Sequence, residues 1–351
     1  MSRQYVIPIF VPHKGCPNDC IFCNQKSISG QTKPIKKEEI TNTIETFLHS
    51  FKQEGKYIEI AFFGGSFTGI EIQEQEELLK IAYEYIKAGK VDSIRVSTRP
   101  DYIDKERLLL LKKYGVKTIE LGVQSTNDYI LKKCKRGHTF EDVKKASKLI
   151  RRMGFVLGHQ MMIGLPESSK LDEIRTAKDL AKLKPKIVRL YPVLVIKNTE
   201  LEKEYYDKKY EPISLTHAVE TCKELFYYFN SKRITVIRMG LQNTDIISNP
   251  ENIESEVVAG PYHEAFGQLV EDSIWYDIIV SKIKKFNTKV LEIEIEANPE
   301  NINNIIGHKK ENLKKFKDIY DVNVKVRQDE NLKPGKFNII VLKTYKDFLD
   351  Q

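Results

Sequence analysis

The chain has 351 residues, 41% of them hydrophobic and 10% aromatic, which is enough for one large and one small domain or for two medium ones. Its formal net charge of +8, from 57 Lys and Arg against 49 Asp and Glu, suits either plain solubility or a nucleic-acid partner. Apolar runs stay short of the roughly 18 residues of a membrane span, and prolines interrupt the apolar stretch near the start, so we expect a cytoplasmic protein without signal peptide or membrane span.

Strand-like and helix-like segments alternate from residue 5 to about residue 191. Apolar, β-branched runs predict strands at 5–11, 57–63, 93–98, 117–123, 155–163 and 186–196. Helical periodicity predicts helices between them at 37–53, 74–87, 104–113, 140–152 and 170–182. This alternation implies parallel βαβ units. We therefore predict an α/β fold with a partial (β/α)6 TIM-like barrel, and a doubly wound sheet is the alternative that the pattern leaves open.

The alternation weakens after about residue 205. Residues 214–241 predict a helix followed by a strand, and residues 260–286 predict a Gly-Pro turn followed by a long amphipathic helix. The tail predicts, in order, a strand, a helix, the turn "GHKK", a second helix and two strands, at 290–297, 299–306, 307–310, 311–320, 322–328 and 337–343. We predict three parts: the barrel at 1–240, a helical extension packed on it at 241–287, and a small α+β module at 288–351.

The distinctive motifs follow the ends of five predicted strands. They are the cysteines after the first strand, "GGS" after the second, "TRPD" after the third, "QS" after the fourth and "MMIGLPES" at the fifth. In parallel α/β folds the chemistry lies at the carboxyl ends of the strands. The motifs therefore predict an active site along this edge.

Three of the five cysteines lie in "CPNDCIFC", with spacing C-x3-C-x2-C. In a reducing compartment such a cluster points to metal or redox chemistry and not to disulfides. A structural zinc prefers four ligands and would need a fourth such as His13, Cys134 or Cys222. An iron–sulfur cube takes cysteine ligands too, and three of them leave one iron open.

Cys16, Cys20 and Cys23, with the aromatic Phe22 before the third cysteine, resemble the signature of the radical S-adenosylmethionine superfamily. The resemblance implies that these cysteines are the metal ligands and the catalytic centre, holding a [4Fe–4S] cluster whose open iron binds S-adenosylmethionine. It implies reductive cleavage of that cofactor to a 5′-deoxyadenosyl radical, with ferredoxin or flavodoxin as electron donor. Gly64 and Gly65 would let the backbone approach the methionine amino group.

Residues 120–143 resemble the strand-four region of the oxygen-independent coproporphyrinogen oxidases and of the radical domain of the Elongator catalytic subunit. This implies that Gln124 contacts the cofactor's ribose and that Arg136 contacts its carboxylate, which an arginine can bind through two parallel hydrogen bonds. Gln160 is a further expected contact. The Elongator resemblance continues, in order, through most of residues 5–240, at 97–104, 136–143, 161–166, 189–212 and 237–242.

The chain departs from the Elongator pattern at two points. Ser97 stands where relatives usually carry a glutamate, so Ser97 and Ser66 are expected to share the binding of the cofactor's amino group with backbone carbonyls. The Elongator subunit also carries an acetyltransferase domain, for which these 351 residues leave no room. Acetyl transfer by an appended domain is therefore not implied.

Several further residues are candidates for substrate or RNA contacts. Arg99, His138 and His263 are the candidates within residues 1–287. The tail resembles a KH module, whose loop grips nucleic-acid backbone, with Gly307 at its first glycine and Lys310 replacing the second. Lys309 and Lys310 add charge that attracts phosphate. For Cys134 and Cys222 we expect buried structural thiols.

These features together predict a radical enzyme that modifies tRNA or another RNA. The first alternative is a radical enzyme acting on a small molecule such as a tetrapyrrole, which would show no RNA retention. The second is a non-enzymatic RNA-binding protein with a structural zinc, which would be colourless and loaded with zinc.

Overall fold

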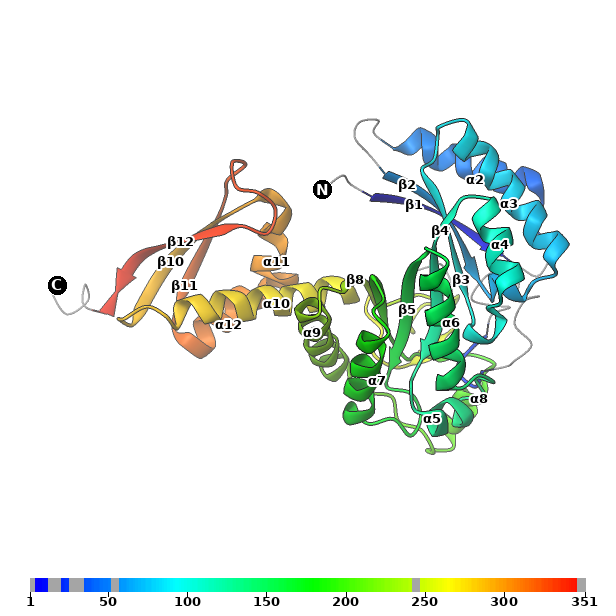
Figure 1. The fold of residues 1–351 in the computed structure, drawn as a ribbon. Helices are drawn as coiled ribbons and strands as arrows, with labels where there is room; N and C mark the ends of the chain where they lie inside the picture. The colour runs from blue at the N-terminus through cyan, green and yellow to red at the C-terminus, as the bar shows by residue number, and fades with distance from the viewer. Residues whose placement is uncertain (1–3, 12–19, 25–34, 52–56, 242–246, 346–351) are drawn as a thin grey trace. The chain divides into compact units, whose positions relative to one another are not determined.

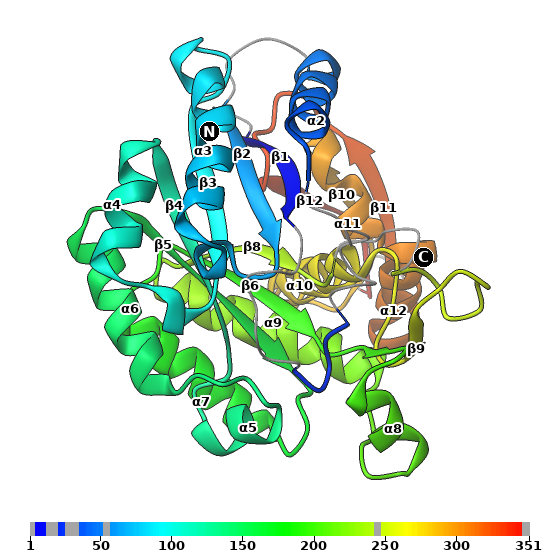
Figure 2. The ribbon, with the colours of Figure 1, turned by 90° about the vertical axis from the view of Figure 1, so that its right-hand side faces the viewer.

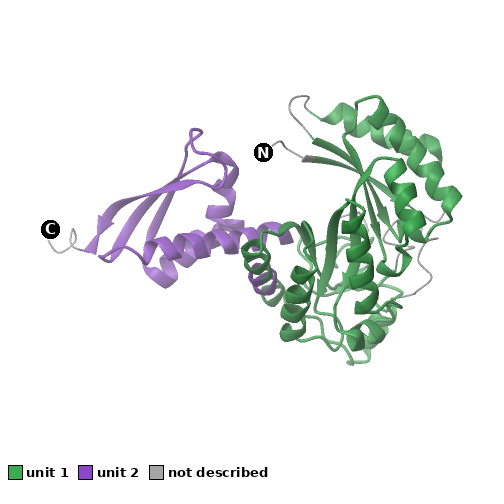
Figure 3. Ribbon diagram, viewed as in Figure 1, with its two compact units in different colours: residues 1–218, 225–264 green, residues 219–224, 265–351 purple. Residues whose placement is uncertain are grey.

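The computed structural model describes residues 4–11, 20–24, 35–51, 57–241 and 247–345 (Figure 1). These residues form two compact units, one of residues 1–218 and 225–264 and the other of residues 219–224 and 265–351 (Figure 3). The three-part division predicted from the sequence stays a prediction, and each unit is described by itself below.

The first unit is built on an open sheet of seven parallel strands, which is a half-barrel of the α/β class. The spatial order is β1 (Gln4–Val11), β2 (Tyr57–Gly64), β3 (Ser93–Thr98), β4 (Val116–Gln124), β5 (Val156–Ile163), β6 (Ile187–Pro192) and β8 (Thr235–Met239). The six predicted barrel strands are confirmed, and the strand predicted within 214–241 joins them as the seventh. Among the described residues no pairing joins β1 to β8, so these two strands are the edges of the sheet.

Helices connect successive strands. They are α2 (Lys37–Ser50), α3 (Ile72–Lys87), α4 (Lys105–Lys113), α5 (Asp128–Lys133), α6 (Phe140–Arg152), α7 (Lys170–Lys182), α8 (Glu200–Tyr206) and α9 (Leu215–Ser231). Figures 1 and 2 show α3, α4 and α6 together along one side of the strands. Local hydrogen bonds fix where two of the helices begin. Thr139 forms a capping box with Asp142 at the start of α6, and Ser169 forms one with Asp172 at the start of α7. A small antiparallel sheet pairs β7 (Val195–Ile196) with β9 (Val257–Ala259).

Buried charges connect four strands of the half-barrel. Arg95 on β3 donates from Nε to Glu59 Oε2 on β2 at 3.0 Å and from Nη1 to Glu120 Oε1 on β4 at 2.7 Å. Arg189 on β6 donates from Nη2 to Glu120 Oε1 at 3.0 Å. Burial disfavours the Glu120 carboxylate, but the charges of Arg189 and Arg95 prevail and lower its pKa. Each buried charge thus has an opposite partner, as buried ions require.

The second unit has α10 (Phe266–Ile283), β10 (Val290–Ala297), α11 (Ile302–Ile306), α12 (Glu311–Tyr320), β11 (Asn323–Gln328) and β12 (Phe337–Thr344). The sheet order is β11-β10-β12, with β11 parallel and β12 antiparallel to β10. Ile293, Ile295, Ile305 and Phe316 form its core, against which Trp275 of α10 packs. The predicted order of strands and helices in the tail is confirmed.

None of the helices in the described part of the chain combines the length and the apolar character that crossing a membrane requires.

Candidate active site

A cavity of about 260 Å³ lies inside the half-barrel, where the strands converge. Every strand of the large sheet contributes to its wall, as do Phe22 and Cys23 from the cysteine segment. The polar lining residues are Ser97, Gln124, Gln160, Arg189, Tyr191 and Arg238. The others are apolar or small, with Phe10, Phe63, Met162, Leu194, Ile196, Leu241 and Ile247 beside Gly64. Such a mostly apolar cavity with a few convergent polar groups is the usual form of a ligand site.

The cysteine segment is fixed by backbone hydrogen bonds to two neighbouring connections. The Cys23 N–H donates to the Cys20 carbonyl at 2.9 Å and closes a turn. Ile21 donates to the carbonyl of Cys134, just after α5, at 3.3 Å, and its own carbonyl accepts from Leu201 of α8 at 2.8 Å. Ile21 and Phe22 are buried in an apolar cluster with residues of both connections. Cys16 and His13 lie outside the described residues.

The surroundings of the described thiols fit an iron–sulfur cluster. Cys20 is buried, and Cys23 is half-buried and lines the cavity. Arg136 donates from Nη2 to the Gly122 carbonyl at 2.7 Å and from Nη1 to the Cys20 sulfur at 3.3 Å. Thiolates are the ligands that iron–sulfur clusters take, and hydrogen bonds to their sulfurs tune such clusters. The contact of Arg136 with the Cys20 sulfur was not predicted from the sequence.

Cys134 lacks the features of a metal ligand. It is fully buried, and burial, together with the nearby Cys20, raises the pKa of its thiol to about 12. A thiol that keeps its proton is a poor ligand, because metals bind the thiolate. Within the described ranges no three His, Cys, Asp or Glu side chains come together as a metal site.

Gln124 has the geometry of a ligand-binding residue. The pairing of β4 with β5 shifts register between Gly122 and Gln124, and Gln124 itself has a φ of 68°. Bulges re-aim side chains beside active sites, and a non-glycine residue at positive φ is strained. Its Oε1 is buried, yet no described residue donates a hydrogen bond to it. An acceptor left open in a cavity fits the hydroxyl groups of a ribose.

Gly64 and Ser97 line the cavity, whereas Ser66 does not. Gly64 has a φ of +112°, and a Cβ there would come within 2.5 Å of the Val11 carbonyl oxygen on β1. Ser97 accepts from Gln160 Nε2 at 3.3 Å, which holds both side chains on the cavity wall. Ser66 is buried, with its Oγ 2.8 Å from Thr98 Oγ1, and it accepts from the Arg99 N–H at 3.2 Å. Gly65 is half-buried directly after β2.

The candidate substrate contacts of the first unit lie outside the cavity wall. Arg99 is buried and donates to both carboxylate oxygens of Asp101, at 3.0 and 2.8 Å. His138 Nε2 lies 3.3 Å from the Val123 carbonyl and therefore carries the proton. Burial, helped by Arg136, lowers the pKa of His138 to about 4, so its ring is neutral at pH 7. His263 is half-buried.

Gly164, which follows β5, is fixed from both sides. Glu173 Oε1 on α7 accepts its N–H at 2.6 Å, and the Tyr210 hydroxyl donates to its carbonyl at 2.7 Å. Burial raises the pKa of Glu173 to about 7. This clamp positions the end of β5, on which Met162 lines the cavity.

Sequence reasoning missed the β6 and β8 side of the cavity. Arg189, Tyr191 and Arg238 lie there, together with Phe63 on β2. The available signal was an arginine in the middle of an apolar strand, in "KIVRLYPV" and again in "TVIRMGL". Such a charge is buried at a cost and is kept where it is paired or functional.

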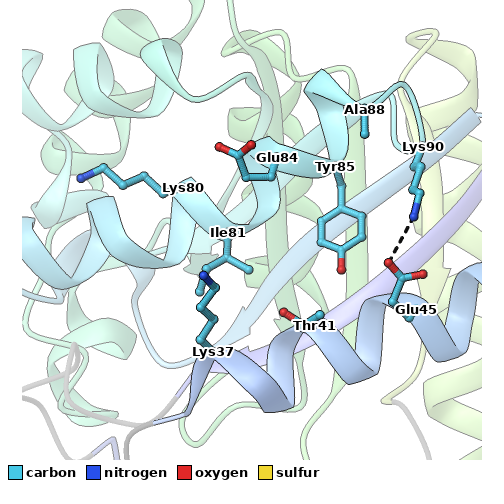
Figure 4. Close-up of a pocket in the computed structure, with 9 residues that line it drawn as sticks. All are labelled: Lys37, Thr41, Glu45, Lys80, Ile81, Glu84, Tyr85, Ala88 and Lys90. Atoms are coloured by element: carbon cyan, nitrogen blue, oxygen red, sulfur yellow. Dashed lines mark hydrogen bonds and ion pairs between the residues drawn. The ribbon is translucent and has the colours of Figure 1, made fainter.

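A larger hollow of about 590 Å³ lies on the outer helices and not at the strand ends. Figure 4 shows side chains of α2 and α3 around it, with Lys90 paired to Glu45 at 3.3 Å. Its charged lining residues carry both signs, and none comes from a strand. It therefore lacks the convergent groups of the strand-end cavity.

In the second unit the "GHKK" turn is held in a defined conformation. Gly307, Lys309 and Lys310 have positive φ values of 78°, 51° and 64°. The His308 N–H donates to Asp272 Oδ2 on α10 at 2.7 Å, and Asn312 donates to the Asp272 carbonyl at 2.8 Å. Lys309 and Lys310 are exposed. Lys310, which stands where the KH motif has its second glycine, thus adopts a left-handed conformation that glycine adopts more readily than other residues.

Comparison with known proteins gives consistent matches. Residues 10–180 match the Radical SAM superfamily, and residues 185–276 match the Radical_SAM C-terminal domain. A tRNA uridine(34) acetyltransferase of Methanocaldococcus jannaschii is 30% identical over 260 residues, covering 63% of this chain and 48% of the relative. Human Elongator complex protein 3 is 26% identical over 254 residues, covering 60% of this chain and 46% of the relative.

Among solved structures, the archaeal Elp3 of Methanocaldococcus infernus with an N-terminal deletion has a TM-score of 0.59 at 23% identity. That match covers 80% of this chain and 64% of the other, and it supports the fold. The chain spans about half the length of the first of these curated relatives, 48% of it.

Proposed function

The chain belongs to the radical S-adenosylmethionine superfamily and is an enzyme of that type, and from this premise we propose that it modifies a tRNA. We propose that Cys16, Cys20 and Cys23 bind a [4Fe–4S] cluster and that S-adenosylmethionine occupies the cavity beside Cys23. When bound, the pair supplies reductive cleavage of S-adenosylmethionine to a 5′-deoxyadenosyl radical, with a small electron-transfer protein such as ferredoxin or flavodoxin as donor. The observation that carries the site is the open Gln124 oxygen in a cavity that Cys23 also lines.

The roles proposed for the chain's own residues follow from their contacts. Arg136 donates a guanidinium N–H to the Cys20 sulfur, a contact of the kind that tunes an iron–sulfur cluster held by that sulfur. Gln124, Ser97 and Gln160 present acceptors and donors that orient a nucleoside on the cavity wall. The aromatic side chains Phe10, Phe22 and Phe63 exclude water around the reacting atoms, which protects a reactive species from side reactions.

Three observations support an RNA substrate. The curated relatives include proteins named tRNA uridine(34) acetyltransferase, and the net charge of +8 suits a polyanion. The exposed Lys309 and Lys310 lie on a turn whose conformation is fixed before any ligand binds. Because the chain spans 48% of the first such relative, acetyl transfer itself is not part of the proposal.

Anaerobic reconstitution with iron and sulfide, followed by S-adenosylmethionine and a reductant, tests the chemistry. We expect a bound cluster and formation of 5′-deoxyadenosine by the wild type. Cys20→Ala should lose both, whereas the matched variant Cys134→Ala should keep both, because Cys134 is a buried protonated thiol. A normal cluster in Cys20→Ala would show that the ligands are assigned wrongly, and zinc in place of iron would refute the proposal.

Filter binding of bulk tRNA over a range of salt concentrations tests the substrate. The double variant Lys309→Glu, Lys310→Glu should bind tRNA more weakly and flatten the slope of log affinity against log salt by about 2, one for each phosphate that a lysine no longer neutralises. Lys105→Glu, Lys148→Glu, which makes the same charge change on the exposed outer helices α4 and α6, is the control. Equal tRNA affinity of the two double variants would show that the turn is not part of the RNA interface. Absence of tRNA binding by the wild type would favour a small-molecule substrate.

A further inference from the structure

The carboxylate of Glu120 lies behind the wall of the active-site cavity, the hollow of about 260 Å³ that Cys23 lines. Glu120 is on β4, with Ser97 of β3 and Gly158 of β5 as its cross-strand neighbours. Its side chain is fully buried and is not part of the cavity lining. Gly158 makes room for it, because a Cβ there would come within 2.9 Å of Glu120 Cγ. Glu120 can therefore act on a ligand only through its neighbours.

Both oxygens of this carboxylate are fully used as acceptors. Oε1 accepts from Arg95 Nη1 at 2.7 Å and from Arg189 Nη2 at 3.0 Å. Oε2 accepts from Arg189 Nε at 2.5 Å and from Gln160 Nε2 at 3.1 Å. These four hydrogen bonds fill the capacity of an ionised carboxylate, which accepts and does not donate. Arg189 and Gln160 line the cavity, so Glu120 holds two residues of its wall.

Glu120 decides which way the Gln160 amide points. Gln160 Nε2 donates to Glu120 Oε2 and also, at 3.3 Å, to Ser97 Oγ. A hydroxyl both accepts and donates, so Ser97 tolerates either orientation of the amide. The carboxylate does not, because a reversed amide would place its own oxygen against Glu120 Oε2, acceptor against acceptor. The amide nitrogen is thereby fixed on the Glu120 side.

The fixed amide leaves Gln160 Oε1 as an open acceptor on the cavity wall. No described residue donates a hydrogen bond to it. Gln124 Oε1 is a second acceptor of this kind on the same wall. A glutamine that could turn would offer a ligand either its oxygen or its nitrogen, whereas Gln160 offers only its oxygen. A fixed acceptor discriminates against ligands without the matching donor, since it is then left unpaired.

We propose that Glu120 is a positioning residue: by fixing the Gln160 amide, it makes this wall of the cavity select a hydrogen-bond donor, a hydroxyl or an amine, on the bound nucleoside. The proposal rests on the proposed function in that S-adenosylmethionine is taken as that nucleoside. A purely structural role of the buried charges would stabilise the barrel without deciding what the cavity accepts. Glu59 provides the comparison, because it pairs with the same Arg95, lines no part of the cavity and makes no hydrogen bond with Gln160.

Equilibrium dialysis of the reconstituted protein, without reductant, measures the selection. The ligands are S-adenosylmethionine and four analogues. Each analogue lacks one donor: the methionine amine, the adenine amine (replaced by a carbonyl), the ribose 2′-hydroxyl or the ribose 3′-hydroxyl. The variants are Gln160→Met, Glu120→Gln and the double variant Glu120→Gln, Gln160→Glu, and Glu59→Gln is the matched control. The analogue that binds more weakly identifies the donor that the wall selects.

We expect the wild type to bind at least one analogue about tenfold more weakly than S-adenosylmethionine, as loss of one hydrogen bond to a buried acceptor predicts. This penalty should disappear in Gln160→Met, because a thioether is only a weak acceptor. It should also disappear in Glu120→Gln, whose amide can donate to Gln160 and reverse it. The double variant should restore the penalty, since a carboxylate at position 160 offers only acceptors. Glu59→Gln should keep the penalty.

Urea unfolding shows whether each variant is folded. If Glu120→Gln does not fold, Glu120→Asp keeps the charge beside both arginines but withdraws it from Gln160 by one methylene. That variant should then lower the penalty, and an unchanged penalty would contradict the proposal.

Three results would overturn the positioning role. The first is a wild type for which no analogue is penalised, and the second is a penalty in Glu120→Gln that equals that of the wild type. The third is an equal loss of the penalty in Glu120→Gln and Glu59→Gln, since the effect would then belong to the buried charges in general. If the penalty follows Glu120 as expected but the wild type with reductant forms no 5′-deoxyadenosine, the proposed function is refuted and the positioning role stands.

Discussion

Glu173 is expected to make the protein less stable at neutral than at mildly acidic pH. Its side chain is buried, with the Gly164 N–H as donor to one oxygen and no described donor to the other. Burial raises its pKa from the ordinary 4.5 to about 7, and the Gly164 hydrogen bond offsets only part of this. The folded protein therefore holds this proton more tightly than the unfolded chain does. Stability falls as pH rises from about 4.5 to about 7, where the native carboxyl ionises.

The size of the effect follows from the same values. At ~1.4 kcal/mol for each tenfold change in proton affinity, a rise from 4.5 to about 7 corresponds to about 3 kcal/mol of lost stability above neutral pH. Glu173→Gln keeps an oxygen for the Gly164 N–H and cannot ionise. The variant should therefore match the wild type closely at about pH 5 and exceed its free energy of unfolding by up to about 3 kcal/mol at about pH 8.

Urea unfolding followed by far-ultraviolet circular dichroism measures this difference. Other groups with shifted pKa values, such as His138, are common to both proteins and cancel in the comparison. Glu106→Gln, on the exposed side of α4, is the matched control and should show no such pH-dependent difference. A Glu173→Gln variant that is no more stable than the wild type at about pH 8 would refute the reasoning, since the buried carboxylate would then carry no penalty.

Substitutions at three further positions test the geometry. Gly64→Ala should lower the free energy of unfolding by about 2 kcal/mol or more and weaken S-adenosylmethionine binding, because its Cβ would meet the Val11 carbonyl; wild-type stability in urea would contradict this. Gln124→Gly should be about 1 kcal/mol more stable than Gln124→Ala, since φ is 68°, while equilibrium dialysis should show both binding the cofactor more weakly. Lys310→Gly should likewise have a free energy of unfolding about 1 kcal/mol higher than that of Lys310→Ala, measured in an unfolding transition followed by Trp275 fluorescence. The reverse order would mean that the turn is not left-handed.

Much of the fold could be predicted because the sequence signals are local and repeated. The ranges 140–152 and 170–182 coincide with α6 and α7, where a capping box marks each start. The short helices α5 and α8 and the two-residue strand β7 were not predicted as separate elements, because segments of that length are too short to show a period.

The site was predicted unevenly. Phe22, Gly64, Ser97, Gln124 and Gln160 line the cavity, and all five were expected cofactor contacts, Ser97 as a departure from the family pattern and Gln160 from its place in the fifth strand. Ser66 was expected to help bind the cofactor's amino group because Ser97 replaces the usual glutamate; its hydroxyl lies 2.8 Å from Thr98 Oγ1 in a buried cluster, and its role toward the cofactor stays a prediction. Arg238 was not named as a site residue, although it is an arginine within an apolar strand and lies in the segment 237–242 that resembles the Elongator pattern.

The short segment that carries Cys20 and Cys23 is stabilised by hydrogen bonds to backbone groups from two distant stretches of the chain. Ile21 uses one peptide group to bond behind α5 and another to bond at the start of α8. We expect assembly or oxidative loss of the proposed cluster to be transmitted to both helices through these bonds. Hydrogen exchange at Leu201 should then report whether the cluster is intact, without any spectroscopic signal from iron.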